Sequence, residues 1–385
     1  MKIYYNATGY PLKRMIISKT SYEYEKISKA YDAKLLFLYL FSKVFPQIKK
    51  DNIFNRIEFI YKPIINLDGI FHGFNTIYIG KARWVSTMEY MFPAGYYNMT
   101  EESYLKYAGK LVKYLAQDNC IKLLPMSEFS KNRIVKDIEF LSSPNETEKI
   151  LKKIYVIHPP QAELITEKEI KAKYNSNTKI NICFVGRDFW RKGGYISLKA
   201  LKRLRKKYNN FNFILVSSLL DDGGWYVSEK DNIKQEILDC DFIEWYEELE
   251  NNKVIELLKK SHLGLLPTYG DTYGFSVLEM QACGCPCVTT DGFALPEINN
   301  DECGWLMNQA NITADSSHEE RLQEQEKIIE NITNILEKEI FGNENYLSII
   351  EKKAMNSLIR IRTEHNPERY KDKLEEIYKC VSNDI

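Results

Sequence analysis

The stretch that decides the fold runs from Pro267 to Ile298 and reads PTYGDTYGFSVLEMQACGCPCVTTDGFALPEI. Its first acid, Asp271, is followed by seven residues and then by Glu279. The triplet Gly274-Phe275-Ser276 lies between the two acids. This pattern predicts a loop that leaves a strand, a close glycine turn and then a helix.

That helix is expected to begin near Ser276 or Val277. Its first turn would present unpaired backbone N–H groups and the positive end of the helix dipole, which together suit a diphosphate. Glu279 would lie about one turn inside the helix, where a carboxylate can accept hydrogen bonds from vicinal hydroxyls such as those of a ribose. The stretch therefore predicts a nucleotide site.

A second distinctive stretch, GRDFWRKGG, covers Gly186–Gly194 and follows a predicted strand. Arg187 and Lys192 are placed where two cations can hold a diphosphate, the arginine bidentately and the lysine as a point charge. The order of residues is not that of a Walker A loop. No strand end carries a clean G-x-G-x-x-G motif, which argues against a dinucleotide-dependent dehydrogenase.

Strand and helix candidates alternate through the second half of the chain, and this alternation predicts a doubly wound parallel sheet. The strands are expected at Lys179–Val185, Phe211–Ser217, Gly264–Pro267 and Pro286–Thr289, and the helices at Gly194–Lys207 and Val254–Ser261. The length of 385 residues suits two domains of this kind. We expect an α/β protein in which two such domains face each other across a cleft.

The first half carries three strand candidates, at Ile57–Tyr61, Asn66–Phe71 and Trp84–Met88. Ligands of parallel α/β sheets bind at the carboxyl ends of the strands. His72, Asn75 and Glu89 follow two of these strands and are therefore site candidates by position. A loop histidine without a functional role is the alternative for His72.

The domain boundary is expected near a stiff, proline-containing segment. The helix candidate before it is broken at Ser142–Asn145, a short strand is expected at Ile154–Ile157, and His158-Pro159-Pro160 follows. We predict a first domain over residues 1–160, a linker over 161–178, a second domain over 179–366 and a final helical segment over 367–385.

The overall charge of zero hides an asymmetry between the two halves. Residues 1–175 hold 27 of the 53 basic residues and 18 of the 53 acidic ones, which leaves 26 and 35 for the remainder. A basic first half could face anionic lipid or an anionic acceptor, and mutual attraction of two domains is the alternative. Nothing in the sequence points to nucleic acid as a partner.

The longest apolar run, Leu35–Phe41, is far shorter than the roughly 20 residues that span a bilayer. The first ten residues, MKIYYNATGY, lack the apolar core of a signal peptide. We therefore expect a cytoplasmic protein, with peripheral contact at the inner face of the membrane as a further expectation. The spacing of Cys283, Cys285 and Cys287 does not match zinc-binding C-x-x-C pairs, so these are expected to be packing thiols.

The ordered set formed by the basic loop, the Asp-x7-Glu pair about 80 residues later, and Ala282–Pro286 resembles glycosyltransferase family 4. These are retaining enzymes of the two-domain GT-B fold, also described as glycosyl transferases group 1. The resemblance is specific over residues 179–310 and looser over 57–178. It implies that the final helix, Pro367–Lys379, crosses back onto the first domain.

The resemblance also implies roles for individual residues. Glu279 corresponds to the acid that binds the nucleotide ribose, and Asp271 to the acid beside the donor sugar, where Glu is more usual. Arg187 and Lys192 would neutralise the diphosphate as the bond to the anomeric carbon breaks. The other donor-binding positions are Gly274, Phe275 and Ser276 with the neighbouring Tyr273, and Ile243 in the segment whose backbone reads the nucleobase.

The acceptor side departs from the family pattern. Family members often place a His after the strand that corresponds to Trp84–Met88, whereas this chain has Glu89, which we take as a catalytic candidate. The Gly-rich loop usual after the first strand is reduced to Ala7-Thr8-Gly9. His72 and Asn75 remain acceptor-side candidates.

The residues and the resemblance together predict a glycosyltransferase that moves a sugar from a UDP-, GDP- or ADP-linked donor to a hydroxyl of a glycan, a lipid-linked sugar or another glycoconjugate, as in polysaccharide biosynthesis. The resemblance implies that the enzyme is retaining. No cofactor and no metal are expected, because the cations and the helix opening could stabilise the leaving diphosphate. The alternatives are a catalytically silent subunit that supports a partner enzyme and, in the same fold, a nucleotide-sugar epimerase.

Overall fold

The computed structural model describes residues 1–27, 60–63, 66–90, 101–175, 179–219, 232–312 and 316–382. The apolar run Leu35–Phe41 and residues 57–59 of the predicted strand Ile57–Tyr61 lie outside this set. The chain divides into two compact units, Met1–Pro160 with Pro367–Ile385, and Gln161–Asn366. None of the described helices is long and apolar enough to cross a membrane.

The first unit is built on a parallel sheet in the order β2-β1-β4-β6-β7. Its strands are β1 Lys2–Tyr5, β2 Glu23–Lys26, β4 Ile70–Phe74, β6 Trp84–Met88 and β7 Cys120–Pro125, and a separate pair joins β3 Ile60–Tyr61 to β5 Ile77–Tyr78. Its helices are α1 Tyr10–Met15, α4 Glu101–Leu115, α5 Glu128–Leu141, α6 Pro144–Leu151 and α15 Pro367–Ser382. The sheet has apolar residues on both faces, as a parallel sheet covered by helices requires.

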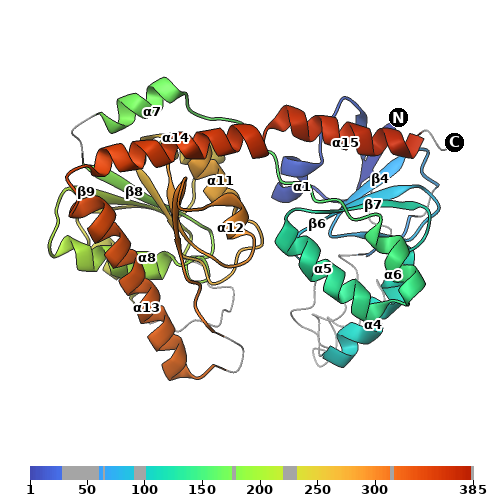
Figure 1. Ribbon diagram of the computed structural model, residues 1–385, viewed down its shortest axis with the longest axis horizontal. Coiled ribbons are helices and arrows are strands. Elements are labelled where there is room, and N and C mark those ends of the chain that lie inside the picture. The colour runs from blue at the N-terminus through green and yellow to red at the C-terminus, as the bar shows by residue number, and fades with distance from the viewer. Residues whose placement is uncertain are drawn as a thin grey trace. The chain divides into compact units, whose positions relative to one another are not determined.

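The second unit is built on a parallel sheet in the order β10-β9-β8-β11-β12-β13. The strands are β8 Ile180–Val185, β9 Phe211–Val216, β10 Ile243–Tyr246, β11 Leu263–Leu266, β12 Cys287–Thr290 and β13 Gly304–Met307. The helices are α7 Glu167–Tyr174, α8 Gly194–Arg205, α9 Ile233–Leu238, α10 Asn251–Lys260, α11 Phe275–Ala282, α12 Leu295–Ile298, α13 His318–Leu336, the π-helix Glu337–Phe341 and α14 Tyr346–Glu364. Helices α8 and α13 lie on one side of this sheet, and α11 and α14 lie on the other (Figure 1). The predicted doubly wound α/β architecture is confirmed.

Two predicted strands have different bounds in the structure. The strand predicted at Asn66–Phe71 is β4, Ile70–Phe74, whose pairing with β1 begins with Ile70 opposite Ile3. The strand predicted at Ile154–Ile157 forms only an isolated bridge, between Ile154 and Leu123 of β7. The N–H groups of Tyr155 and Ile157 still donate to the carbonyl oxygens of Leu123 and Pro125, at 2.9 and 3.0 Å. Pro125 of β7 has no N–H to donate in return, so the bridge does not extend into a strand.

Residues 161–178, predicted as a linker, contain the ordered helix α7 of the second unit. Thr166 and Glu169 form a capping box at its start. Near its end, Lys173 Nζ donates to the carbonyl oxygens of Ser261, Cys283 and Gly284 at 2.9, 3.0 and 2.9 Å. Removal of the ammonium group from water lowers the pKa of this lysine. Helix α7 is therefore fastened to the loop that follows α11.

The last helix of the chain, α15, belongs to the first unit, as predicted for a helix that crosses back. Tyr370 Oη donates to the carbonyl oxygen of Met15 at 2.7 Å. Tyr378 Oη lies 2.5 Å from His72 Nδ1, and the other ring nitrogen of His72 lies 2.9 Å from Thr87 Oγ1. Figure 1 shows α15 in red beside the strands of the same unit. Segments from both ends of the sequence therefore share one core.

His72 is a buried strand residue and does not lie in the loop after the strand. It is 0 % exposed inside β4, and burial lowers its pKa from 6.5 to about 3. Its two ring nitrogens are occupied by Tyr378 and Thr87, so the neutral imidazole joins α15 to the sheet. The position predicted as an acceptor-side candidate is thus used for packing in this structure.

Stability should fall below pH 6.5 in part because of His72. The unfolded chain binds a proton at this histidine near pH 6.5, whereas the folded chain does not until about pH 3. Stability is therefore complete above pH 6.5 and is lost as the pH falls toward 3, by up to about 1.4 kcal/mol per pH unit from this group. His72→Gln should flatten the dependence of the melting temperature on pH between 7 and 5. The exposed His318→Gln is the control, and identical slopes for the two variants would contradict the assignment.

Candidate functional site

Two loops of the second unit meet at the carboxyl end of its central strands. The first, residues 186–193, follows β8, and the second, residues 267–274, follows β11. Strands β8 and β11 are paired neighbours, and the chain leaves β8 for β9 in the opposite direction. This is the point at which the strand order reverses, where ligands of open α/β sheets bind. We call these segments the first and second donor loops, after the donor that the sequence predicts for them.

An ion pair joins the two donor loops. Lys192 Nζ lies 2.9 Å from Asp271 Oδ2, and the two side chains are only 21 % and 11 % exposed. The second carboxylate oxygen, Oδ1, accepts the backbone N–H of Gly274 at 3.2 Å. Asp271 therefore binds the lysine of one loop and the N-cap residue of α11 at once.

The charge state of Asp271 is set by these partners. Burial alone would raise the pKa of this carboxyl, but the charge and hydrogen bond of Lys192, with Arg191 nearby, hold it below its usual value of 3.8. The carboxylate is therefore ionised at neutral pH and can accept hydrogen bonds only.

Glycine is required where the first donor loop enters α8. Gly193 has a φ of 83°, and a Cβ there would lie 2.2 Å from the carbonyl oxygen of Pro267. Gly274, the N-cap of α11, has a φ of 91°. Both positions lie in the left-handed region that residues with a side chain adopt at a cost. The close approach of the two loops thus depends on a missing side chain.

Helix α11 begins at Phe275, one residue before the predicted start, and carries Ser276 and Glu279. Ser276 Oγ is a buried atom with no hydrogen-bond partner among the described residues. Glu279 is 8 % exposed. The first turn therefore offers a hydroxyl and backbone N–H groups beside the Lys192–Asp271 pair, and a buried carboxylate one turn further on.

The remaining donor-side candidates are Arg187, Ile243 and Tyr273. Arg187 is exposed, its carbonyl oxygen accepts the Ser218 hydroxyl at 3.0 Å, and no contact within the described chain joins its side chain to Lys192 or Asp271. Ile243 begins β10, at the edge of the sheet. Tyr273 is fully buried.

The environment of Tyr273 is that of a core residue. Its ring centroid lies 5.9 Å from that of Phe275 and 6.4 Å from that of His365. It is 0 % exposed, so its predicted contact with a donor would require the surrounding side chains to move. The sequence places it correctly next to the glycine turn but cannot show that the ring points into the core.

Arg191 is the site residue that was not assigned from the sequence. Its Nε lies 2.7 Å from Asp188 Oδ2, and its Nη1 donates to the carbonyl oxygen of Gly270. Its own carbonyl oxygen accepts the N–H of Tyr269 at 2.9 Å and the hydroxyl of Thr268 at 3.1 Å. The basic composition of the loop was visible in the sequence, but the partner loop was not.

The first unit brings two of its candidates together. Asn75, at the end of β4, donates from Nδ2 to Glu89 Oε2 at 3.3 Å, and its Oδ1 accepts the Glu89 N–H at 2.8 Å. Asn75 adopts a φ of 50°, and its N–H donates to the carbonyl oxygen of Thr87 at 2.7 Å. Ser130 donates to the carbonyl oxygen of Glu89. Asn75 therefore orients Glu89, which follows the adjacent strand β6.

The cysteines inside the deciding stretch are packing residues. Cys283, Cys285 and Cys287 are fully buried free thiols, and burial raises the pKa of Cys283 to about 12. Cys285 Sγ lies 3.8 Å from Sγ of Cys183, which belongs to β8. Within the described ranges, no group of three His, Cys, Asp or Glu residues is placed to hold a metal ion.

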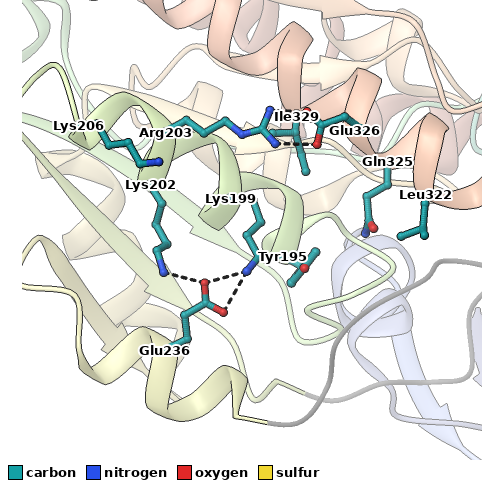
Figure 2. A pocket seen from close by; sticks show the side chains of 10 residues that line it. All are labelled: Tyr195, Lys199, Lys202, Arg203, Lys206, Glu236, Leu322, Gln325, Glu326 and Ile329. Carbon is teal, nitrogen blue, oxygen red and sulfur yellow. Dashed lines mark hydrogen bonds and ion pairs between the residues drawn. The ribbon is translucent and has the colours of Figure 1, made fainter.

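A groove of about 450 Å³ lies elsewhere on the second unit, between α8, α9 and α13 (Figure 2). Its basic side chains are mostly paired: Glu236 Oε1 lies 2.8 Å from both Lys199 Nζ and Lys202 Nζ. Arg203 makes a two-pronged contact with Glu326. None of the residues that line the groove belongs to either donor loop. The ion pairs along the groove join α8 to α9 and α13.

The close approach of the donor loops predicts a severe effect of Gly193→Ala. The added Cβ would meet backbone at Pro267 and sit in a left-handed conformation, so we expect a loss of at least about 2 kcal/mol of stability. Gly109→Ala is the control, because Gly109 lies within α4 with nothing inside 4 Å of its Cβ position. That variant should gain about 0.5–1 kcal/mol. Thermal unfolding of both variants measures the difference, and equal melting temperatures would contradict it.

The chain resembles known proteins in two ways. Residues 166–339 match the family model described as Glycosyl transferases group 1. No curated protein matches the chain. Three solved structures show how far the likeness of fold extends.

The Anabaena protein HepE, solved in complex with UDP-glucose, is 15% identical with a TM-score of 0.57, and the match covers 100% of both chains. A UDP-forming α,α-trehalose-phosphate synthase from Burkholderia xenovorans is 12% identical with a TM-score of 0.59, covering 99% of each chain. A glycosyltransferase from Rickettsia africae is 16% identical with a TM-score of 0.54, covering 98% of this chain and 89% of the other. The chain therefore has the GT-B fold, carries a glycosyl transferases group 1 domain in its second unit, and is a glycosyltransferase.

Proposed function

We propose that the protein transfers a sugar from a nucleotide diphosphate donor to a hydroxyl acceptor with retention of the anomeric configuration. The observation that carries this proposal is the Lys192–Asp271 pair at the start of α11, at the reversal of strand order. A cation, a carboxylate and a helix N-terminus are there within one small region. The UDP-glucose complex of the similar Anabaena protein supports a sugar nucleotide as the donor class.

The leaving group is the part of the reaction that this region suits best. As the bond to the anomeric carbon breaks, negative charge develops on the departing diphosphate. Lys192, the N–H groups at the start of α11 and the Ser276 hydroxyl can stabilise that charge, and Arg187 adds a second cation. One fixed donor of this kind is worth about 3 kcal/mol. These groups supply the stabilisation without a resident metal ion in the proposed reaction.

The two acids, Glu279 and Asp271, bind different parts of the donor. Glu279 accepts hydrogen bonds from the ribose hydroxyls, and Asp271 accepts them from hydroxyls of the sugar to be transferred. The depressed pKa of Asp271 keeps it an acceptor through the neutral and mildly acidic range. Asp is shorter than Glu by one methylene, so a sugar hydroxyl has to come closer to the main chain of the second donor loop.

Acceptor binding is assigned to the first unit. Glu89 carries a carboxylate at the end of β6 that Asn75 orients through two hydrogen bonds. A carboxylate in that place can bind and orient an acceptor hydroxyl. His72 is not included, because both of its ring nitrogens already have partners in the core.

The donor assignment predicts distinct effects of Lys192→Met and Glu279→Ala. The purified chain should show a rise in melting temperature with one class of UDP-, GDP- or ADP-sugar, because a ligand that binds only the folded state stabilises it. Lys192→Met should lower kcat about 10²- to 10³-fold. Glu279→Ala should raise KM about 10- to 100-fold, the range for lost hydrogen bonds to a charged group.

Matched controls are available on exposed parts of the same unit. Lys206→Met and Glu330→Ala replace an exposed lysine and an exposed glutamate outside the donor loops, and both should behave as wild type. If the wild-type chain neither binds nor turns over any of the donors, the proposed function is wrong. That result would favour the alternative, a catalytically silent subunit that supports a partner enzyme.

Retention has its own test. The anomeric proton of the first product should be followed by NMR before mutarotation or secondary transfer. An α-linked donor is expected to give an α-linked product. A β-linked product would show inversion and would remove this part of the proposal while leaving the donor assignment intact.

A further inference from the structure

Arg191 holds the two donor loops together through several independent contacts. Its guanidinium binds Asp188 in the first loop and the carbonyl oxygen of Gly270 in the second. Its main-chain carbonyl oxygen accepts hydrogen bonds from Thr268 and Tyr269 of the second loop at 3.1 and 2.9 Å. One residue thus contacts the second donor loop with both its side chain and its backbone.

Asp188 holds the side chain and the backbone of Arg191 in place. It is 6 % exposed, its Oδ1 accepts the Arg191 N–H at 3.2 Å, and its carbonyl oxygen accepts the Lys192 N–H at 3.2 Å. The arginine side chain is 36 % exposed, so its head is partly shielded from water. A planar guanidinium can bind a carboxylate and a carbonyl in two directions at once, which the point charge of a lysine does less well.

The contact between Arg191 and Gly270 matters because of the residues that follow each of them in the sequence. Lys192 directly follows Arg191, and Asp271 directly follows Gly270, so the contact joins the residues next to both members of the 2.9 Å ion pair. A shift of either loop would change the position of the lysine and of the carboxylate relative to the donor. We propose that Arg191 is a positioning residue for sugar transfer, which sets the relative placement of Lys192 and Asp271. This inference rests on the proposed function.

The competing interpretation is a purely structural arginine. Such a residue would lower stability when removed but would leave the chemistry of the folded enzyme unchanged. Arg203 provides the matched comparison, because it also makes a two-pronged contact with a carboxylate, Glu326, and is 40 % exposed, yet lies outside the donor loops (Figure 2).

The experiment compares Arg191→Gln, Arg191→Lys and the control Arg203→Gln in the full chain, with the donor identified for wild type. Arg191→Gln should lower kcat about 10- to 100-fold, since small misplacements of catalytic groups cost up to about 10²-fold. Arg191→Lys should fall between wild type and Arg191→Gln. Arg203→Gln should keep the wild-type kcat even if its melting temperature falls as far.

Three further measurements separate positioning from folding. The acid limb of kcat/KM should move to higher pH in Arg191→Gln, because Asp271 loses a nearby positive charge and a firmly held Lys192. In a double-mutant cycle with Asp271→Asn, the second substitution should add little, since both act through the same pair. Hydrogen exchange in peptides covering residues 186–193 and 267–274 should rise in Arg191→Gln and stay unchanged in Arg203→Gln.

Different outcomes overturn different statements. An active wild type with unchanged kcat and unchanged exchange in Arg191→Gln overturns the positioning role alone. Fully additive effects of Arg191→Gln and Asp271→Asn also overturn it. A wild type that uses no nucleotide sugar overturns the proposed function and this inference with it.

Discussion

The arrangement of the second unit depends on one buried carboxylate. Asp271 is 9 % exposed and ionised, and an unpaired charge in that position would be costly to bury. Lys192 from one loop and the Gly274 N–H from the start of α11 together offset that cost. The same two contacts bring a cation and a helix N-terminus to the edge of the sheet. The requirement to satisfy a buried charge and the proposed binding of a diphosphate donor are therefore met by the same groups.

The two units use similar sheets in different ways. Each has a strand-order reversal, and in the second unit the loops at the reversal carry paired charges. In the first unit the histidine of β4 is buried and neutral, and it holds α15 against the sheet. The polar pair at the strand ends there is Asn75 with Glu89, which has the chemistry of hydroxyl recognition. The proposed division into a diphosphate-binding unit and an acceptor-binding unit follows from this difference in charge.

Much of the second unit could be predicted because its signals are local. The strands β8, β9, β11 and β12 and the helix α8 begin and end within two residues of their predicted bounds. Each is an apolar run or an amphipathic repeat ended by a turn signal. The prediction of a strand at Ile154–Ile157 was wrong. Its apolar residues suit a strand, but Pro125 of the neighbouring strand β7 has no N–H that could extend the pairing beyond one bridge. Helices α13 and α14 were not predicted.

In the candidate site, too, local sequence signals predicted some features, and others depended on contacts between distant residues. Lys192, Asp271, Gly274, Ser276 and Glu279 could be named from charge, glycine and helix-start signals within two short stretches. The sequence alone therefore determined the α/β class, the two stretches proposed to bind the donor and the types of residue in them. Only the tertiary structure decided that Lys192 pairs with Asp271, that Arg191 binds the second loop, and that His72 and Tyr273 point into cores. These contacts join residues 79, 306 or 92 positions apart, and local patterns do not record which distant backbone or side chain will satisfy a buried polar group.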